Sequence, residues 1–348
     1  MEKPKQKMAN RTLRKILIPF MAIFLVLILI LNAVGSLAGA TLDTYLGAGA
    51  KSIVGGNGAD ANYYPTTYKN NEEAAEAAYA VAKRVAEEGS VLLKNDGVLP
   101  LAKGSTVVPF GYAYLNPIYG QLTSGGSAKW VINPVTPEQG LSAYTINTSA
   151  VERMQAAAVE ILTEAPGTKE AGAAGSMLGG DCKIYEYNAS IYNALSEVPG
   201  STGVVFVTRS GQAGQDQKYD AYADGTPHYL ALSENEKGAI RAAKAACDNV
   251  VLVLVSSAPM ELGPVVDGEL ECDAILWIGH PGERGFATLS ELLDGDVNPS
   301  GRTVDTYSRD FTKDPSYANL GLFEYSNLLT TSGAYAYADG PYARRYTE

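Results

Sequence analysis

The sequence predicts an α/β protein: a three-layer α/β/α sandwich with a mainly parallel sheet, preceded by a single N-terminal transmembrane helix. Three observations predict this. Short apolar runs alternate with helix-like segments, the run VVLVLV at 250–255 is apolar on both faces, and an uncharged stretch follows a basic N-terminus. Strands that are apolar on both faces belong to sheets covered by helices on both sides. Alternating strands and helices predict parallel pairing with right-handed crossovers.

The first 38 residues form a basic segment followed by an apolar one. Residues 1–15 carry lysines and arginines, and residues 16–38 carry no charge. A helix rising ~1.5 Å per residue over that length spans a hydrocarbon core of ~30 Å. The basic flank predicts a cytoplasmic N-terminus. The alternative is a long signal peptide cleaved near Ala38–Gly39–Ala40. Both alternatives predict an extracytoplasmic globular domain, which the first anchors to the cell membrane by a single pass.

Beyond the apolar segment, composition and periodicity divide the chain into three parts. Residues 39–70 predict a linker, residues 71–312 a folded domain, and residues 313–348 a Tyr-rich tail. Inside the domain, apolar runs predict strands at 106–110, 204–208, 250–255 and 274–278. Helical stripes predict helices at 72–88, 151–162 and 233–247, and another that ends at Leu293. Ser233 and Glu236 predict a capping box at the start of the third helix.

Charge and residue inventory exclude several classes of function. The formal net charge of −11 disfavours nucleic acid as a partner, because polyanion binding needs a basic face. Two histidines and three cysteines without a CxxC pair predict neither a metal centre nor a Ser-His-Asp triad. The spacing G-x-x-G-x-x-G at 279–285 is not the dinucleotide fingerprint and is typical of a tight turn into a helix. We therefore predict no metal and no cofactor.

Three loops are expected at the carboxyl ends of the predicted strands, where α/β proteins place their sites: 209–216, 256–261 and 279–285. The first reads RSGQAGQD. Its central residues Gln212, Ala213 and Gln215 cannot exchange a proton at neutral pH. On these residues alone, the loop is either an active-site loop without its acid or an ordinary polar turn.

Several segments, in order, resemble glycoside hydrolase family 3. They are VAEEGSVLLKNDGVLPL at 85–101, the segments 111–127, 228–240 and 249–262, and AILWIGHPGERGFATLSELLDGDVNPSGRTVDTYSRDF at 274–311. The resemblance is to the α/β-sandwich domain that accompanies the family's TIM barrel, in a membrane-anchored member with inverted domain order. It implies a retaining β-glycosidase that works with two carboxyl groups. Its nucleophile belongs to the barrel, for which the 37 residues after Phe311 leave no room, so a barrel is expected in trans or encoded downstream.

The resemblance places the acid/base residue in a loop that reads R-S-G-x-E-G-x-D. Arg209, Ser210, Gly211, Gly214 and Asp216 match this pattern, and the position of the Glu is Ala213. A shift of one residue places Gln212 there, which is not ionisable either. A refolded loop could instead use Asp216, Asp220 or Asp224. We assign no catalytic residue, and we expect this chain to be inactive by itself.

The resemblance also implies contacts to a carbohydrate, either a β-glucoside or a β-glucan. The predicted substrate-binding residues are Ser124, Arg209, Gln212, Asp216 and His228. Arg209 could instead hold the loop in place, His228 could be a satisfied surface residue, and Ser124 could lie in a plain turn. The predicted function is the sandwich half of an extracytoplasmic glycoside hydrolase. The alternatives are a non-catalytic, membrane-anchored carbohydrate-binding or scaffold module, or a truncated gene product.

Overall fold

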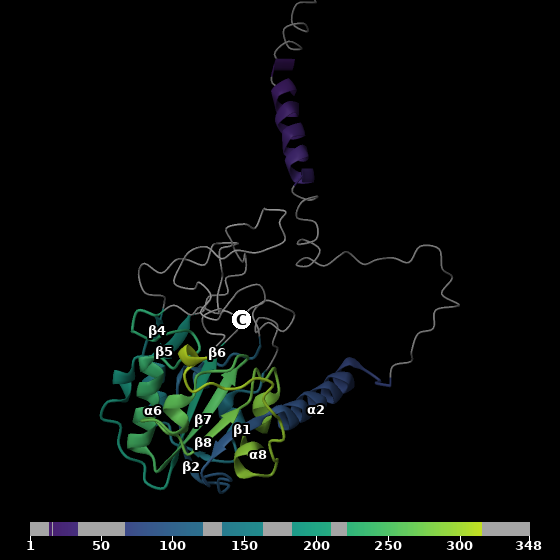
Figure 1. Cartoon of the computed structure of the whole chain (residues 1–348). Helices are drawn as coiled ribbons and strands as arrows, with labels where there is room; N and C mark the ends of the chain where they lie inside the picture. The colour runs from purple at the N-terminus through teal and green to yellow at the C-terminus, as the bar shows by residue number, and fades with distance from the viewer. Residues whose placement is uncertain are drawn as a thin grey trace, which may run out of the picture. The chain divides into compact units, whose positions relative to one another are not determined.

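The computed structural model of the protein describes residues 14–15, 17–33, 67–120, 134–162, 183–209 and 221–314. The chain divides into two units, Met1–Thr67 and Tyr68–Glu348. In the first unit, residues 17–33 form a helix (Figure 1). Its large apolar side chains are exposed. Among the described residues, no helix is both long and apolar enough to cross a membrane. The transmembrane helix predicted at 16–38 is therefore not found, although residues 16 and 34–38 lie outside the described ranges.

The second unit is built on a six-stranded sheet with the strand order β1-β8-β7-β6-β2-β3 (Figure 1). The strands are β1 (Val91–Asn95), β2 (Thr106–Phe110), β3 (Thr145–Ile146), β6 (Thr202–Arg209), β7 (Asn249–Ser256) and β8 (Ala274–Trp277). All neighbours pair in parallel except β1, which runs antiparallel to β8 at the edge of the sheet. The predicted mainly parallel sheet is confirmed.

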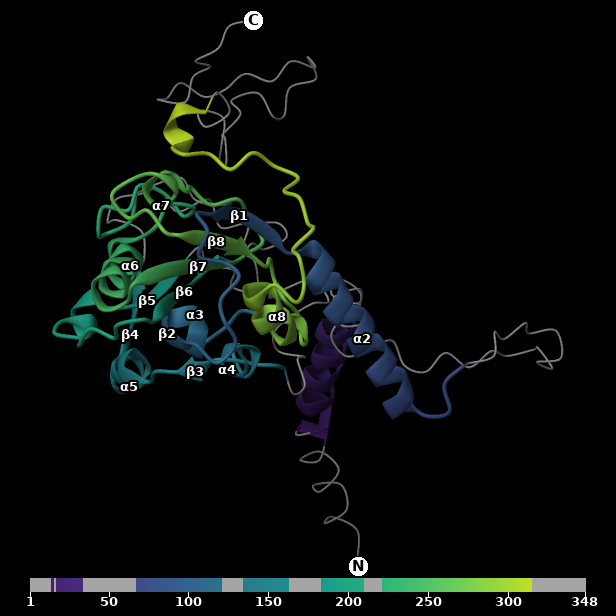
Figure 2. The same cartoon turned by 90° about the horizontal axis from the view of Figure 1, so that it is seen from below.

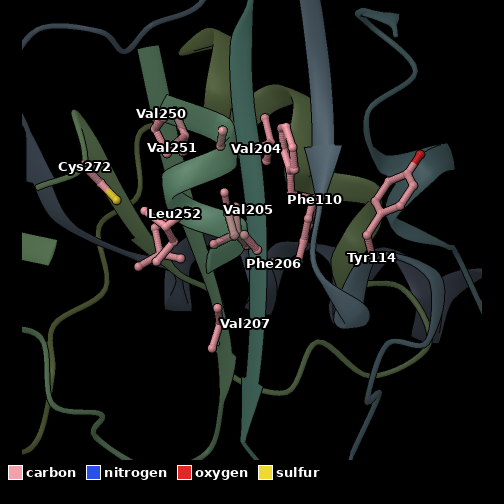
Figure 3. Packing of buried hydrophobic residues seen from close by; sticks show 14 of the residues in the cluster. Phe110, Tyr114, Val204, Val205, Phe206, Val207, Val250, Val251, Leu252 and Cys272 are labelled. Carbon is pink, nitrogen blue, oxygen red and sulfur yellow. The ribbon is translucent and has the colours of Figure 1, made fainter. Parts of the chain in front are cut away.

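The centre of the sheet is buried on both faces because β6 and β7 are apolar at almost every position. Gly203 on β6 faces α6 (Glu234–Ala246), since a Cβ at this glycine would lie 2.9 Å from the Cβ of Ala243. Phe206 faces the other way, and its ring packs against Tyr114 of α3 (Tyr112–Leu115). Figure 3 shows this packing around Phe110, Tyr114 and residues 204–207. A two-faced core of this kind requires helices on both sides.

Helices accordingly cover both faces of the sheet. On the face opposite α6 lie α3, α4 (Pro137–Gly140), η3 (Gly285–Thr288) and α8 (Leu289–Asp294). Figure 2 shows α6 and α8 on either side of the strands. Beside η3, α2 (Asn71–Gly89) extends away from the sheet, and none of its residues is buried. The remaining short elements are α7 (Gly263–Val266), η2 (Ala189–Tyr192) and η4 (Phe311–Lys313). The predicted α/β sandwich is confirmed.

One predicted helix is wrong over half its length. The expected helix at 151–162 is instead α5 (Ser149–Ala156) followed by β4 (Val159–Leu162). β4 pairs with β5 (Ile184–Tyr187) in a separate antiparallel sheet. Val159 and Ile161 are β-branched and favour a strand, and the pairing of β4 with β5, which is distant in sequence, overrides the helical periodicity. The capping box of Ser233 and Glu236 at the start of α6 is confirmed.

The residues after α8 cross the domain as an extended segment. The Gly301 N–H donates to the Ser90 carbonyl at the end of α2, over 3.0 Å. Further along, the Leu262 N–H donates to the Ser308 carbonyl (3.1 Å), and the Phe311 N–H donates to Glu261 Oε2 (3.0 Å). The segment therefore carries the chain from the end of α2 to the loop that follows β7.

We expect Gly111→Ala to destabilise the domain more than Gly97→Ala. Both glycines have positive φ angles, +93° and +98°, so each substitution costs about 1–3 kcal/mol in backbone strain. Only at Gly111 does an added Cβ meet a backbone atom, the Phe206 carbonyl oxygen at 2.3 Å, whereas nothing lies within 4 Å at Gly97. Overpacking adds about 1–3 kcal/mol. Urea unfolding of both variants measures the difference, and equal midpoints would contradict the close approach at Gly111.

Candidate functional site

The parallel strands β6, β7 and β8 end side by side, and their ends form what we call the carboxyl edge. Arg209 is opposite Ser256, and Leu254 is opposite Trp277. The loops that follow these three strands therefore start close together, as the sequence predicted. Two of the predicted site residues, Arg209 and His228, fall in the described ranges. Ser124, Gln212, Ala213 and Asp216 lie outside the described residues.

Arg209 is buried, with 1% of its surface exposed, and its side chain is fully hydrogen-bonded. Its guanidinium makes two bonds to the Glu236 carboxylate, at 2.5 and 2.7 Å. Its other three donors bond backbone carbonyls, those of Thr208, Tyr229 and Ala231. A guanidinium has five N–H groups, and all five are used here. Of the two alternatives for Arg209, the structure therefore supports the structural one: no donor is left for a sugar hydroxyl.

The ion pair also fixes the charge of Arg209. Burial acts to lower the pKa of the guanidinium, but the attraction and hydrogen bonds of Glu236 outweigh it and raise the pKa above its ordinary value. Glu236 is itself held by the N–H and hydroxyl of Ser233. The pair thus joins the end of β6, the segment around Tyr229, and the first turn of α6. This role of Glu236 was missed because the sequence shows only its place in a capping box.

His280 holds the backbone at the same point. Its Nε2 lies 3.1 Å from the carbonyl oxygen of Arg209, so Nε2 carries the hydrogen and donates it. Burial lowers the pKa of this imidazole below its ordinary value, which keeps it neutral at pH 7. Sequence reasoning treated the surrounding GHPGERG motif as a turn and missed this contact between the loops after β6 and β8.

His228 is also buried, with 3% of its surface exposed, rather than a surface residue. Its Nε2 lies 3.0 Å from Glu261 Oε2, the same oxygen that accepts from the Phe311 N–H. The imidazole also packs edge-on against the Phe311 ring, with centroids 5.7 Å apart. His228 therefore connects the carboxyl edge to the segment that follows α8, and this geometry gives it a structural contact rather than an open position toward a ligand.

Glu186 is a buried carboxyl group that sequence reasoning did not single out. It lies on β5 and accepts hydrogen bonds from the N–H groups of Tyr112 and Tyr187, with distances of 2.9 to 3.1 Å. Burial, followed by repulsion from Glu236, raises its pKa to about 8, although the two backbone N–H groups act in the opposite direction. At 3% exposure the group is out of reach of a substrate. No signal in the sequence separates it from an ordinary exposed glutamate of an edge strand.

A metal centre is not formed by the described residues: among them, no group of three His, Cys, Asp or Glu side chains has the proximity to hold a metal ion. The two described cysteines, Cys247 and Cys272, are buried free thiols, and burial raises the pKa of both.

The carboxyl edge belongs to an α/β sandwich whose loops gather at one edge of a mainly parallel sheet. A comparison with known families identifies the family that has this domain. The model described as "Glycosyl hydrolase family 3 C-terminal domain" matches residues 90–344. The chain therefore belongs to glycoside hydrolase family 3. The family expected from the sequence motifs is confirmed.

Individual relatives agree with this assignment. The chain is 27% identical over 248 residues to the thermostable beta-glucosidase B of Acetivibrio thermocellus. The aligned region covers 70% of this chain and 28% of the relative. It is 28% identical to beta-glucosidase A of Aspergillus kawachii, covering 71% and 26%. It is 26% identical to the probable beta-D-xylosidase 7 of Arabidopsis thaliana, covering 68% and 27%. The chain thus spans less than a third of the length of these relatives.

Solved structures show the same fold. A beta-glucosidase from Paenibacillus barengoltzii superposes with a TM-score of 0.51 at 24% identity, over 70% of this chain and 26% of that one. Beta-glucosidase 3B from Thermotoga neapolitana, solved in complex with glucose, gives a TM-score of 0.51 at 20% identity, over 72% and 33%. At these identities the likeness establishes the fold alone.

We expect Arg209→Met to destabilise the domain by about 3–5 kcal/mol, because it leaves the Glu236 carboxylate buried without its cation. The double variant Arg209→Met/Glu236→Gln should recover much of this loss, since the amide oxygen can still accept from Ser233 and carries no charge. Arg241→Met on the same helix is the control: that guanidinium is 48% exposed in its pairs with Glu234 and Glu269, and should cost less than about 1 kcal/mol. Urea unfolding measures all three, and equal losses for the two arginines would refute the buried pair's role.

We expect Glu186→Gln to remove a pH dependence of stability. The folded pKa of about 8 exceeds the ordinary value of about 4.3. The folded state therefore binds the Glu186 proton more tightly than the unfolded state does. The resulting stabilisation of the folded state is complete below the unfolded pKa and is lost as pH rises through the folded pKa. Each unit of pKa difference corresponds to about 1.4 kcal/mol. Unfolding free energies between pH 5 and pH 9 should fall less steeply for the variant, whereas identical slopes would contradict a protonated Glu186 in the folded protein.

Proposed function

We propose that this chain supplies the sandwich half of the active site of an extracytoplasmic, β-glucosidase-like glycoside hydrolase. The observation that carries the proposal is the family match over residues 90–344. The fold supports it, because the loops at the carboxyl edge come from the three strands whose sequences match the family. Beta-glucosidases and a probable beta-D-xylosidase among the relatives support a carbohydrate as the ligand.

We propose that the other half of the site comes from a TIM barrel, either a separate polypeptide or residues encoded downstream. The support is the length of the relatives, of which this chain spans 28% and 26% in two beta-glucosidases. In retaining glycosidases one carboxylate attacks the sugar while a second group acts as acid and base. Our proposal assigns the first to the barrel and, from the resemblance of the loop at 209–216 to the family's motif, the second to position 213, where Ala213 has no proton to give.

We propose an extracytoplasmic location, supported by the basic residues 1–15 and the apolar segment behind them. Both a retained anchor at the cell membrane and a cleaved signal peptide lead to this location. Cell fractionation followed by N-terminal sequencing of the mature protein separates the two.

A second candidate is a non-catalytic carbohydrate-binding or scaffold module. Two observations favour it. The side-chain amides of Gln212 and Gln215 flank Ala213 and can bind hydroxyl groups without cleaving a bond. Glu186 has a pKa raised to about 8, as a general acid needs, but it is buried and cannot reach a substrate. A truncated gene product is the third alternative, and the DNA sequence after the codon for Glu348 tests it directly.

We expect no release of nitrophenol from an aryl β-glucoside by this chain alone. With an isolated barrel domain of the family added, Ala213→Glu should exceed the unchanged chain, because general acid/base catalysis contributes about 10²–10⁴-fold. Ala213→Gln is the control of similar size without a proton to transfer. Hydrolysis by the unchanged chain alone would refute the inactive half-site.

Failure of Ala213→Glu to increase activity would favour the non-catalytic module over the half-enzyme. Calorimetry with glucose and short β-glucans then tests that alternative. Binding without hydrolysis supports it, and the absence of heat across the panel contradicts both functions.

A further inference from the structure

Helix α2 has an apolar face that the domain leaves uncovered. Val81 and Val85 are 63% and 65% exposed. Ala74 and Ala78 continue the same face toward the N-terminus, so the four residues follow the helical spacing i, i+4, i+7 and i+11. We call them the α2 stripe. Helices in proteins gain most of their stability by packing an amphipathic face, yet none of the 19 residues of α2 is buried.

The domain contacts α2 on a different side. Arg284 Cζ lies 3.8 Å from the centroid of the Tyr79 ring, and Lys83 Nζ lies 2.5 Å from Glu291 Oε2 of α8. At 3.6 residues per turn, Tyr79 and Lys83 lie roughly 130–170° around the helix axis from the middle of the α2 stripe. The α2 stripe can therefore pack against another molecule while α2 stays attached to its own domain.

We propose that the α2 stripe binds the α2 stripe of a second copy of this chain, with the two helices antiparallel. This contact does not depend on the proposed carbohydrate function. In one register, Ala78 faces Val81 of the second copy and Ala74 faces Val85 of the second copy. Every valine then meets an alanine, and the alternation of large and small side chains across the contact allows the helices to pack closely.

The charges beside the α2 stripe agree with this register. Glu73 and Arg84 lie on the same side of the stripe, and in the antiparallel pair Arg84 comes within about two residues, or ~3 Å along the axis, of Glu73 of the second copy. Arg84 is 77% exposed and pairs with Glu88 of its own helix. An exposed pair of this kind is worth only about 0.3–0.5 kcal/mol and does not hold the guanidinium away from a second carboxylate. Parallel helices would instead bring like charges to the same level, which is destabilising.

The attachment of α2 to the domain also favours the antiparallel pair. α2 joins β1 through Ser90, which is 3% exposed, and Figure 1 shows the N-terminal part of the helix leading away from the sheet. Antiparallel helices of ~28 Å therefore place the two domains at opposite ends of the pair. Parallel helices would place both domains at the same end, where they would compete for the same space.

The first test is sedimentation velocity of the full chain in a mild detergent, which keeps the apolar segment at 16–38 in solution. We expect a monomer–dimer equilibrium with a Kd on the order of micromolar, because four residues per copy form a small interface. Val81→Arg should raise this Kd at least about tenfold, because it places a charge in an apolar contact. Val304→Arg is the matched control, since Val304 is 98% exposed and lies outside α2, and it should leave the Kd unchanged.

A charge reversal tests the register. Glu73→Arg and Arg84→Glu should each raise the Kd by about three- to tenfold, because each turns two attractive contacts of the dimer into repulsive ones. The double variant Glu73→Arg/Arg84→Glu should restore the Kd of the unchanged chain. Circular dichroism checks that every variant keeps its helix content.

Disulfide formation tests the direction of the helices. Ala74→Cys mixed with Val85→Cys should give a covalent dimer on oxidation, and neither variant alone should do so above the level of the unchanged chain. In the antiparallel pair, two copies of residue 74 lie ~16 Å apart along the axis, which is beyond the reach of a disulfide.

Three results would overturn the proposal. The first is a monomer at every concentration, and the second is an equal effect of Val81→Arg and Val304→Arg on the Kd. The third is a covalent dimer of Ala74→Cys alone that the mixture does not exceed, because only parallel helices bring the two copies of that residue together. A family barrel domain as the occupant would show as a complex that Val81→Arg weakens while the chain alone stays monomeric, and this outcome also overturns the proposal.

Discussion

The geometry of the carboxyl edge depends on the buried ion pair of Arg209 and Glu236. Taking two charges out of water is costly, and the cost is recovered only when every donor and acceptor of the pair is satisfied. Arg209 meets this condition by bonding Glu236 together with the carbonyls of Tyr229 and Ala231. The condition fixes the segment around Tyr229 and the first turn of α6 relative to β6. The end of β6 at Arg209 is therefore held by the interior of the domain.

Arg209 and Arg284 both follow strands of the sheet, but their side chains have different surroundings. Arg209 stands in the loop that matches the family's acid/base motif, yet its side chain is closed off by the protein itself. Arg284 stands in a loop interpreted as a tight turn, and its guanidinium stacks on Tyr79 with a buried Nε that has no partner among the described residues. Residue type and motif therefore do not decide how many hydrogen bonds a guanidinium makes inside the domain. The decision depends on which acceptors the fold brings within reach.

The sequence predicts features that are set locally and misses those set by distant partners. Strands β6 and β7 are predicted because Val, Leu and Phe occupy both faces, which only a doubly covered sheet accommodates. The capping box of α6 is predicted because its residues are three apart. β4 is missed because its partner β5 lies more than twenty residues further along, across a stretch without a clear period. Glu186 and Glu236 are missed as buried acids because nothing in their neighbours along the chain distinguishes burial from exposure.

The carboxyl groups at the carboxyl edge lead to a final constraint on catalysis. Glu236 accepts from Arg209 and Ser233, and Glu261 accepts from Phe311 and contacts His228. Asp224 accepts from the N–H groups of Thr226 and Glu234. Each of these three carboxylates already serves as an acceptor for donors that hold a loop or a helix start, and a general acid must instead give its proton to the leaving group. Glu236, Glu261 and Asp224 therefore serve the structure of this edge by holding the start of α6, the segment that follows α8, and the turn at Thr226.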